Sequence, residues 1–170
     1  ADIAEVIAQK AHPQCLFHVD GAQSTGKVPI DLKDLKVDLF SLSAHKFYGP
    51  KGVGALYINR KSARRPSVLK LAPLMFGGQH ERGLRPGTLA SHQIVGLGQA
   101  ALEATQELNK ASTNPLVQLR EELHNGLMKL DPKAIRRGGG EAPHVLSLTV
   151  SPEVLTAIEQ VWGHIAFSRG

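Results

Sequence analysis

The chain has 170 residues, of which 42% are hydrophobic and 21% are charged, a composition that excludes a largely disordered protein. No stretch approaches the roughly 20 consecutive apolar residues of a membrane span, and residues 1–5 lack the pattern of a secretory signal. The formal net charge is +5, but no aromatic residues alternate with the basic run at Lys51, Arg60, Lys61, Arg64 and Arg65, so a solvated face is favoured over a nucleic-acid site.

The first half of the chain alternates short apolar runs with polar connectors. Residues 2–11 have the periodicity of a helix end, and residues 15–19 read as a buried strand that stops at Asp20. A connector with one helical turn is expected over residues 30–36. Two further strands are expected over residues 37–42 and 53–58, separated by a glycine- and proline-containing turn.

The second half opens with a long segment rich in glycine and proline, residues 69–88, and loops of that length are often functional. Helices are predicted over 91–109, from Pro115 onward and over 152–162, with strands over 144–150 and 165–167. Strands alternating with helices predict an α/β architecture. A change in composition near residue 105 predicts two domains, residues 1–105 and 106–170.

Two strand ends carry groups that could act together. Asp20 ends the first predicted strand, and Lys46 follows the second, 26 residues later, a separation that fits one crossover between neighbouring strands. A carboxylate can keep a pyridine nitrogen protonated, and a lysine amine can attack an aldehyde. Ser43 and His45 could hold a phosphate, and Gln23 could donate to a phenolic oxygen. Taken alone, these residues could equally be helix caps, turn formers and surface groups.

Several motifs, in one order, resemble a known family. They are His-Val-Asp-x-x-Gln-Ser-x-Gly-Lys at 18–27, Pro-Ile-Asp-Leu at 29–32, Ser-x-Ser-x-His-Lys-x-Tyr-Gly-Pro-Lys-Gly-x-Gly at 41–54, and Gly-Gly-Gln-His-Glu-Arg-Gly-Leu-Arg-Pro-Gly-Thr at 77–88. Together they resemble the cysteine desulfurases, a branch of the class V aminotransferases that depend on pyridoxal 5′-phosphate (PLP). The resemblance runs from residue 15 to about residue 105 and more loosely to the end.

This resemblance implies the aspartate-aminotransferase-like fold of the PLP-dependent transferases, fold type I. The chain would hold the end of the large domain and most of the small domain, stopping before the loop that carries the family's nucleophilic cysteine. Lys46 matches the catalytic lysine that bonds to PLP, and Asp20 matches the acid that pairs with the ring nitrogen. Gln23 matches a ligand of the phenolic oxygen, while Ser43 and His45 match phosphate ligands. No spacing of the histidines indicates a metal site.

Thr88 matches a threonine that, in the family, reaches across a dimer interface to the partner's cofactor phosphate. The resemblance therefore implies a homodimer in which residues 69–88 form an interface loop, with Arg85 as a possible support. It also implies conversion of L-cysteine to L-alanine, with sulfur passed as a persulfide to an iron–sulfur scaffold or another acceptor. A cytoplasmic location is expected, or a mitochondrial one in a eukaryote, with neither nucleic acid nor membrane as partner.

The chain also departs from the family pattern. Its last residues, 165–170, resemble the lead-in to the nucleophile segment, so the chain as written is expected not to complete desulfuration. Cys15, the one cysteine, is expected to be a small core residue inside a strand and not a replacement nucleophile. His18 is expected to support Asp20, and His80 and His92 to order the loop and the helix start. A selenocysteine lyase, another class V enzyme, or an inactive dimerisation or docking fragment remain alternatives.

Overall fold

The computed structural model describes residues 2–12, 15–60, 71–110, 114–138 and 142–160, and it divides the chain into two compact units, residues 1–110 and 111–170. Among these residues no helix is long and apolar enough to cross a bilayer. The first unit contains α1 (Asp2–Lys10), β1 (His18–Asp20), α2 (Leu32–Leu35), β2 (Leu39–Ser43), the 3₁₀ helix η1 (Ala44–Phe47), β3 (Gly54–Ile58), η2 (His80–Gly83) and α3 (Ser91–Lys110). The second contains α4 (Pro115–Leu130), β4 (Ile135–Arg137), β5 (Ser147–Thr149) and α5 (Pro152–Gln160).

Within the described residues the alternation of strands and helices expected from the sequence is confirmed, and the structure adds the strand β4 and the 3₁₀ helices η1 and η2. The boundary predicted after residue 105 lies inside α3, and the division between the units falls after Lys110. The assignment of the units to a large and a small domain stays a prediction. The strand expected over 165–167, Trp162 and the basic residues 61–65 lie outside the described residues.

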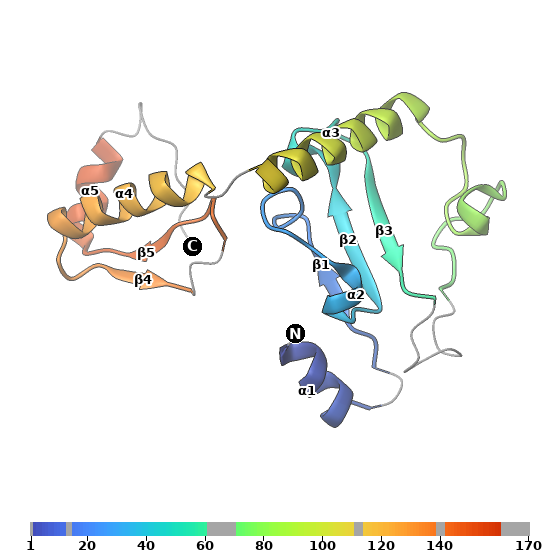
Figure 1. The fold of residues 1–170 in the computed structure, drawn as a ribbon, viewed down its shortest axis with the longest axis horizontal. Helices are drawn as coiled ribbons and strands as arrows, with labels where there is room; N and C mark the ends of the chain where they lie inside the picture. The colour runs from blue at the N-terminus through green and yellow to red at the C-terminus, as the bar shows by residue number, and fades with distance from the viewer. Residues whose placement is uncertain (1, 13–14, 61–70, 111–113, 139–141, 161–170) are drawn as a thin grey trace. The chain divides into compact units, whose positions relative to one another are not determined.

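The first unit is built on a three-stranded sheet of order β1-β2-β3 (Figure 1). β1 runs parallel to β2, whereas β3 runs antiparallel to it. β2 is central, and its first two residues, Leu39 and Phe40, are buried. Within the described residues β1 pairs with β2 alone, and its residues His18 and Asp20 are exposed. The prediction of a buried strand over residues 15–19 is therefore wrong in its position and in its burial.

Cys15 is exposed, so the expectation that it packs in the core is also wrong. The physical reason is its place in the chain. It lies three residues before the outer strand β1, and its Sγ lies 3.9 Å from the carbonyl oxygen of Leu16. No second strand covers this segment within the described residues.

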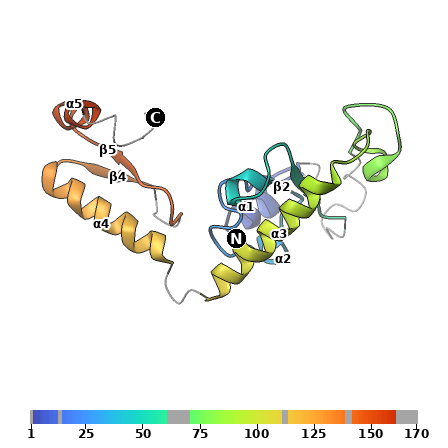
Figure 2. The same ribbon diagram turned by 90° about the horizontal axis from the view of Figure 1, so that it is seen from above.

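The core of the first unit forms where α3 meets η1 (Figure 2). Ala44, Phe47 and Ala100 are its buried members. Leu42, Val53, Leu97 and Ala101 pack around them. Small side chains on α3 let the helix approach closely, and the aromatic ring of Phe47 fills the space between. The 3₁₀ turn that follows β2 is thereby fixed against a 20-residue helix.

A buried carboxylate joins β1 to β2 where the two strands begin. Asp38 is fully buried, and its Oδ2 accepts a hydrogen bond of 2.8 Å from the backbone N–H of Phe17. The backbone N–H of Asn59 donates to the carbonyl of Asp38, and the Asn59 amide donates to the carbonyl of Val37. These contacts tie the starts of β1 and β2 to the end of the antiparallel strand β3 and so help to fix the strand register.

Two helices begin at side-chain caps that can be read in the sequence. Asp31 caps α2 by accepting from the N–H of Lys33 at 2.7 Å. Asn114 caps α4 by accepting from the N–H of Leu116 at 3.0 Å, and Pro115 occupies the first helical turn. Such caps satisfy backbone N–H groups that have no partner within the helix.

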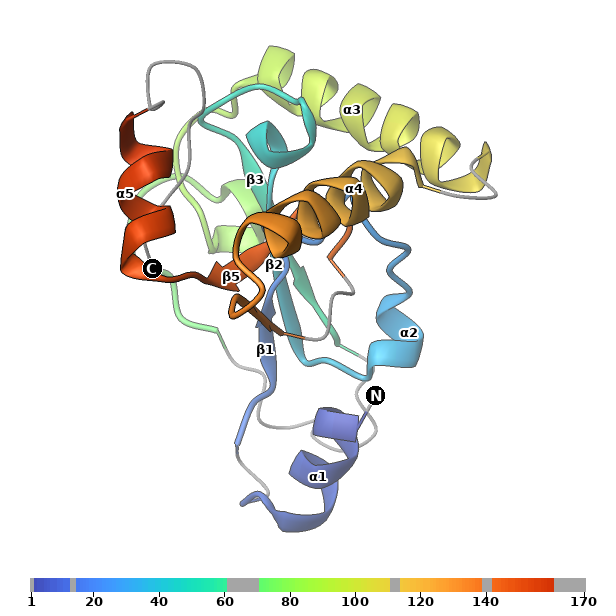
Figure 3. The same cartoon turned by 90° about the vertical axis from the view of Figure 1, so that its left-hand side faces the viewer.

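In the second unit α4 and α5 lie beside an antiparallel pair, β4 and β5 (Figure 1), and Figure 3 shows α4 and α5 from another side. Asp131, which is buried, joins the end of α4 to the start of α5. Its Oδ2 accepts from the N–H of Ser151 at 2.7 Å, and its Oδ1 accepts from the N–H of Lys133 at 3.1 Å. The hydrogen bond from Ser151 is the main reason that the pKa of Asp131 lies below its ordinary value.

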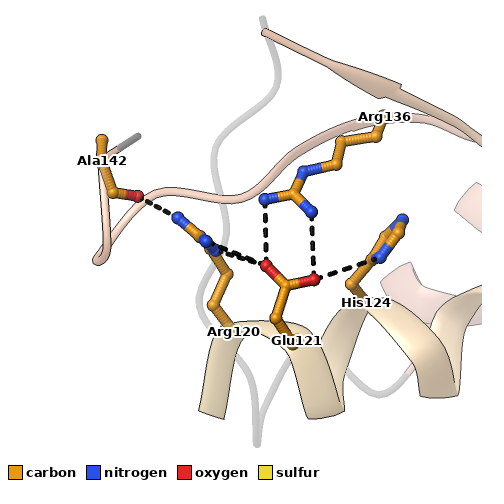
Figure 4. Close-up of polar contacts among 5 residues, drawn as sticks. All are labelled: Arg120, Glu121, His124, Arg136 and Ala142. Carbon is orange, nitrogen blue, oxygen red and sulfur yellow. Dashed lines mark hydrogen bonds and ion pairs between the residues drawn. The ribbon is translucent and has the colours of Figure 1, made fainter. Parts of the chain in front are cut away.

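Glu121 forms the second polar junction of this unit (Figure 4). The guanidinium of Arg136 on β4 donates to both of its carboxylate oxygens, at 3.0 and 3.1 Å. Arg120 donates to Oε1 as well, and also to the carbonyl of Ala142 at 2.6 Å. The hydrogen bonds from Arg136, and then those from Arg120, hold the pKa of Glu121 below its ordinary value of 4.5. His124 Nδ1 lies 3.8 Å from Oε2, so it adds a further contact when protonated.

Candidate functional site at the ends of two parallel strands

The parallel pairing of β1 and β2 brings the predicted site residues to one edge of the sheet. Asp20, the last residue of β1, lies opposite Ser41 of β2. Two residues further along, β2 ends at Ser43, and η1 begins with the segment that carries His45 and Lys46. Both of these side chains are exposed. The acid and the amine therefore leave neighbouring strands at the same edge, where ligands bind in open α/β sheets.

Near the carboxyl ends of β1 and β2, the face of the sheet that carries Asp20 is polar. Because side chains alternate along a strand, His18 and Asp20 share this face with Ser41 and Ser43. The Ser41 hydroxyl donates to Asp20 Oδ1 at 3.4 Å, and His18 Nε2 lies 3.2 Å from Ser41 Oγ. Leu42 points to the opposite face and packs on the core beneath α3.

The turn that follows Asp20 is closed by backbone contacts. The N–H of Ala22 donates to Asp20 Oδ1 at 3.0 Å, and the N–H of Gly21 donates to the carbonyl of Ser41 at 2.8 Å. Glycine is required at position 21, because a Cβ there would lie 1.9 Å from Cζ of Phe40. The turn thus continues the sheet for one residue and holds the carboxylate at its edge.

The same turn contacts the segment that carries Lys46. Gly26 has a φ of +73° and packs so closely on Phe47 that a Cβ would lie 2.6 Å from the Phe47 Cβ. Lys27 Nζ lies 4.2 Å from the centre of the Tyr48 ring, within the range of a cation–π contact. Residues just after the predicted catalytic lysine are therefore fixed by the turn that follows the predicted acid.

Four of the predicted residues are placed as follows. His45 Nδ1 lies 3.0 Å from Ser43 Oγ, so these two candidate phosphate ligands are neighbours. Gln23 is exposed in the turn after β1. No hydrogen bond joins Thr88 to the other predicted residues within the described part of the chain.

The segment between η2 and α3, which contains Thr88, lies on the side of the sheet occupied by β3, away from β1 (Figure 1). Residues just before and after Thr88, including Arg85 and Leu89, line a cavity of about 1190 Å³ along β3. The exposed His80 lies in η2, and the exposed His92 is the second residue of α3. The structure thus gathers Asp20, Ser43, His45 and Lys46 and leaves Thr88 apart.

Sequence reasoning did not single out Ser41 as a site residue, yet its hydroxyl contacts Asp20 directly. The signal was present in the alternation Ser41-x-Ser43, which places two hydroxyls on one face of a strand. The sequence does not show the register between β1 and β2. That register places Ser41, and neither of its neighbours in the chain, opposite Asp20.

Two adjacent parallel strands, followed by an antiparallel strand and a long helix, define an α/β protein. In such proteins ligands bind at the sheet edge where Asp20 and Lys46 lie. The family profile of class-V aminotransferases matches residues 1–154. The chain belongs to this family, whose members depend on PLP.

The relatives and solved structures agree with this assignment. The chain is 49% identical over 136 residues to the cysteine desulfurase IscS of Shewanella piezotolerans, a match that covers 80% of this chain and 32% of that protein. It is 48% identical over 135 residues to the same enzyme of Vibrio atlanticus, covering 79% of this chain and 32% of that protein. The chain therefore spans about a third of the length of the curated relatives it matches.

Two solved structures show the same fold. A NifS-like protein is 36% identical, with a TM-score of 0.75 over 95% of this chain and 43% of that chain. DndA from Streptomyces lividans is 33% identical, with a TM-score of 0.73 over 96% of this chain and 45% of that chain. The fold is thus that of the PLP-dependent transferases of fold type I, as predicted from the motifs.

Proposed function

We propose that this chain supplies part of the PLP site of a cysteine desulfurase, an enzyme that converts L-cysteine to L-alanine and passes the sulfur on as a persulfide. The observation that carries the proposal is the pairing of β1 with β2, which brings Asp20 and the Lys46 segment to one sheet edge. The two IscS relatives support the choice of reaction, since both are named cysteine desulfurases.

The residue types at this edge fit the cofactor. Both donors to Asp20 within the described residues bind Oδ1, which leaves Oδ2 to meet a cationic ring nitrogen. The Ser43 hydroxyl and the His45 imidazole, 3.0 Å apart, suit a phosphate group. The exposed amine of Lys46 is available for a covalent bond, and Gln23 is available for the phenolic oxygen. Bound PLP would supply an electron sink at the substrate's α-carbon.

In this proposal each side chain has one task. Asp20 stabilises the positive charge on the ring nitrogen, and Ser43 and His45 hold the phosphate. Lys46 would hold the cofactor through its amine, and that amine could also carry the substrate's α-proton. Thr88 binds the phosphate of a partner subunit's cofactor, because its segment lies on the β3 side of the sheet, apart from the other ligands. This arrangement requires a homodimer with two composite sites.

The sulfur acceptor in this proposal is an iron–sulfur scaffold or another thiol-bearing protein, and the location is the cytoplasm. The substrate sulfur leaves its carbon by transfer to a protein thiolate, and that carbon gains a proton to give alanine. The thiolate is expected to come from outside this chain, and not from Cys15. The 170-residue chain alone should therefore produce no alanine from cysteine.

Reductive trapping tests the site directly. The chain is incubated with PLP, treated with borohydride, digested and mapped by mass spectrometry. We expect the pyridoxyl group on Lys46, no labelling there in Lys46→Ala, and unchanged labelling of Lys46 in Lys51→Ala, which removes a matched exposed lysine nearby. Labelling spread equally over surface lysines would contradict the proposal and favour a docking or dimerisation role for the chain.

A further inference from the structure

We infer that His18 and Ser41 are positioning residues that hold the Asp20 carboxylate for the ring nitrogen of PLP, with His18 acting through Ser41. This inference rests on the proposed function. It concerns two side chains that belong to no predicted set of cofactor ligands. Neither would touch the cofactor; both would act on the one acid that does.

The donor and the acceptor of each hydrogen bond follow from the number of protons that the side chains carry. Ser41 Oγ carries one hydrogen, which it donates to Asp20 Oδ1 at 3.4 Å. The Ser41 oxygen can then only accept from His18 Nε2, 3.2 Å away, so His18 must carry a proton on Nε2. The three side chains thus form one directed chain, from the imidazole N–H through the hydroxyl to the carboxylate.

The strand register makes this series of hydrogen bonds possible. Parallel pairing sets Asp20 opposite Ser41, and the two-residue repeat of a strand puts His18 on the same face. The N–H of Gly21, which donates to the carbonyl of Ser41, fixes the two strands at this point. A shift of one residue would move Ser41 to the other face and break both hydrogen bonds.

As a result, Oδ1 of the Asp20 carboxylate accepts the hydrogen bonds, and Oδ2 is left to face the ring nitrogen. Oδ1 accepts from Ser41 and from the N–H of Ala22, which restricts rotation about the side-chain bonds. Both donors also stabilise the negative charge that a protonated pyridine needs beside it. Because His18 and Asp20 are exposed, these bonds contribute little to folding, so their removal should alter the site and leave the fold intact.

The first measurement needs no cofactor. Three-bond couplings from the Asp20 carboxyl carbon, measured by NMR on the 18.3-kDa chain, report the rotamer of its side chain. We expect one dominant rotamer in the wild type and in Ser41→Thr, and averaging over several in Ser41→Ala. An unchanged single rotamer in Ser41→Ala would overturn the inference.

The second measurement is PLP affinity. Loss of one hydrogen bond to the carboxylate should weaken PLP binding roughly fivefold in Ser41→Ala. Ser41→Thr should restore it, and Ser24→Ala, whose hydroxyl contacts the carbonyl of Gly21, should bind as the wild type does. The analogue in which a carbon replaces the ring nitrogen should bind the wild type and Ser41→Ala equally, because the inferred effect concerns that nitrogen alone.

A double variant tests whether His18 acts on Asp20 through Ser41. If His18 acts through Ser41, His18→Leu should weaken PLP binding, and adding it to Ser41→Ala should cause no further loss. His18→Gln keeps a donor and should bind close to wild type. Full additivity of the two substitutions would overturn the relay, whereas a wild type that never binds PLP would refute the proposed function and leave the rotamer measurement to decide the geometry.

Discussion

Replacing Gly21 by alanine should destabilise the first unit, because the added Cβ would clash with the buried ring of Phe40. An added Cβ would lie 1.9 Å from Cζ of Phe40, well inside the roughly 3.5 Å of van der Waals contact, and Phe40 is only 3% exposed. Overpacking of this kind costs about 1–3 kcal/mol. A less flexible unfolded chain returns roughly 0.4–1 kcal/mol, so we expect a net loss of about 1–2 kcal/mol.

A matched substitution in the same unit should have the opposite sign. Gly98 lies inside α3, and apart from its two chain neighbours and the backbone of the helix itself, no atom of the described residues lies within 4 Å of the position that an alanine Cβ would take there. Gly98→Ala should therefore gain about 0.5–1 kcal/mol. Urea unfolding followed by circular dichroism gives the free energies. Hydrogen exchange of peptides from β2 and α3 separates this unit from the second one.

A shorter side chain at position 40 tests whether the ring of Phe40 causes the loss of stability. Phe40→Leu removes the atoms that an alanine at position 21 would meet, so the double variant should lose less than the two single losses combined. A Gly21→Ala chain as stable as the wild type, measured beside the expected gain in Gly98→Ala, would show that Phe40 does not restrict this position.

Three further outcomes follow from contacts elsewhere. Because the pKa of Glu121 is lowered in the folded state, its carboxylate stabilises the second unit above pH 4.5, and this contribution is lost as the pH falls through the folded-state pKa. The thermal stability of Glu121→Gln should therefore differ most from that of the wild type at neutral pH and least in acid. Glu122→Gln is the control in the same thermal unfolding measurement. Asn114→Ala should cost about 1 kcal/mol through loss of the α4 cap, and Asn114→Ser should not, as measured by urea unfolding. Lys27→Met should cost about 0.5–1 kcal/mol in the same assay, whereas Tyr48→Phe should keep the cation–π contact; equal losses in both would contradict it.

Much of the architecture could be read from local pattern. The helix predicted over 91–109 is confirmed as α3, because its apolar repeat, length and lack of proline act within one segment. The start of α4 is confirmed at Pro115, where Asn114 and proline provide the capping chemistry. β4 was missed because Ile135-Arg136-Arg137 has no strand signature; it is a strand because β5 pairs with it and Glu121 binds the Arg136 guanidinium.

The sequence by itself determined the family and the α/β class, because these depend on residue types at fixed spacing along the chain, and it predicted Asp20 and Lys46 as the acid and the amine. It could not determine that Cys15 is exposed, since burial depends on which strand lies beside it. Only the tertiary structure decided that Ser41 contacts Asp20 and that Phe40 demands a glycine at position 21. Such contacts depend on strand register, and register is a relation between segments that no single stretch of sequence contains.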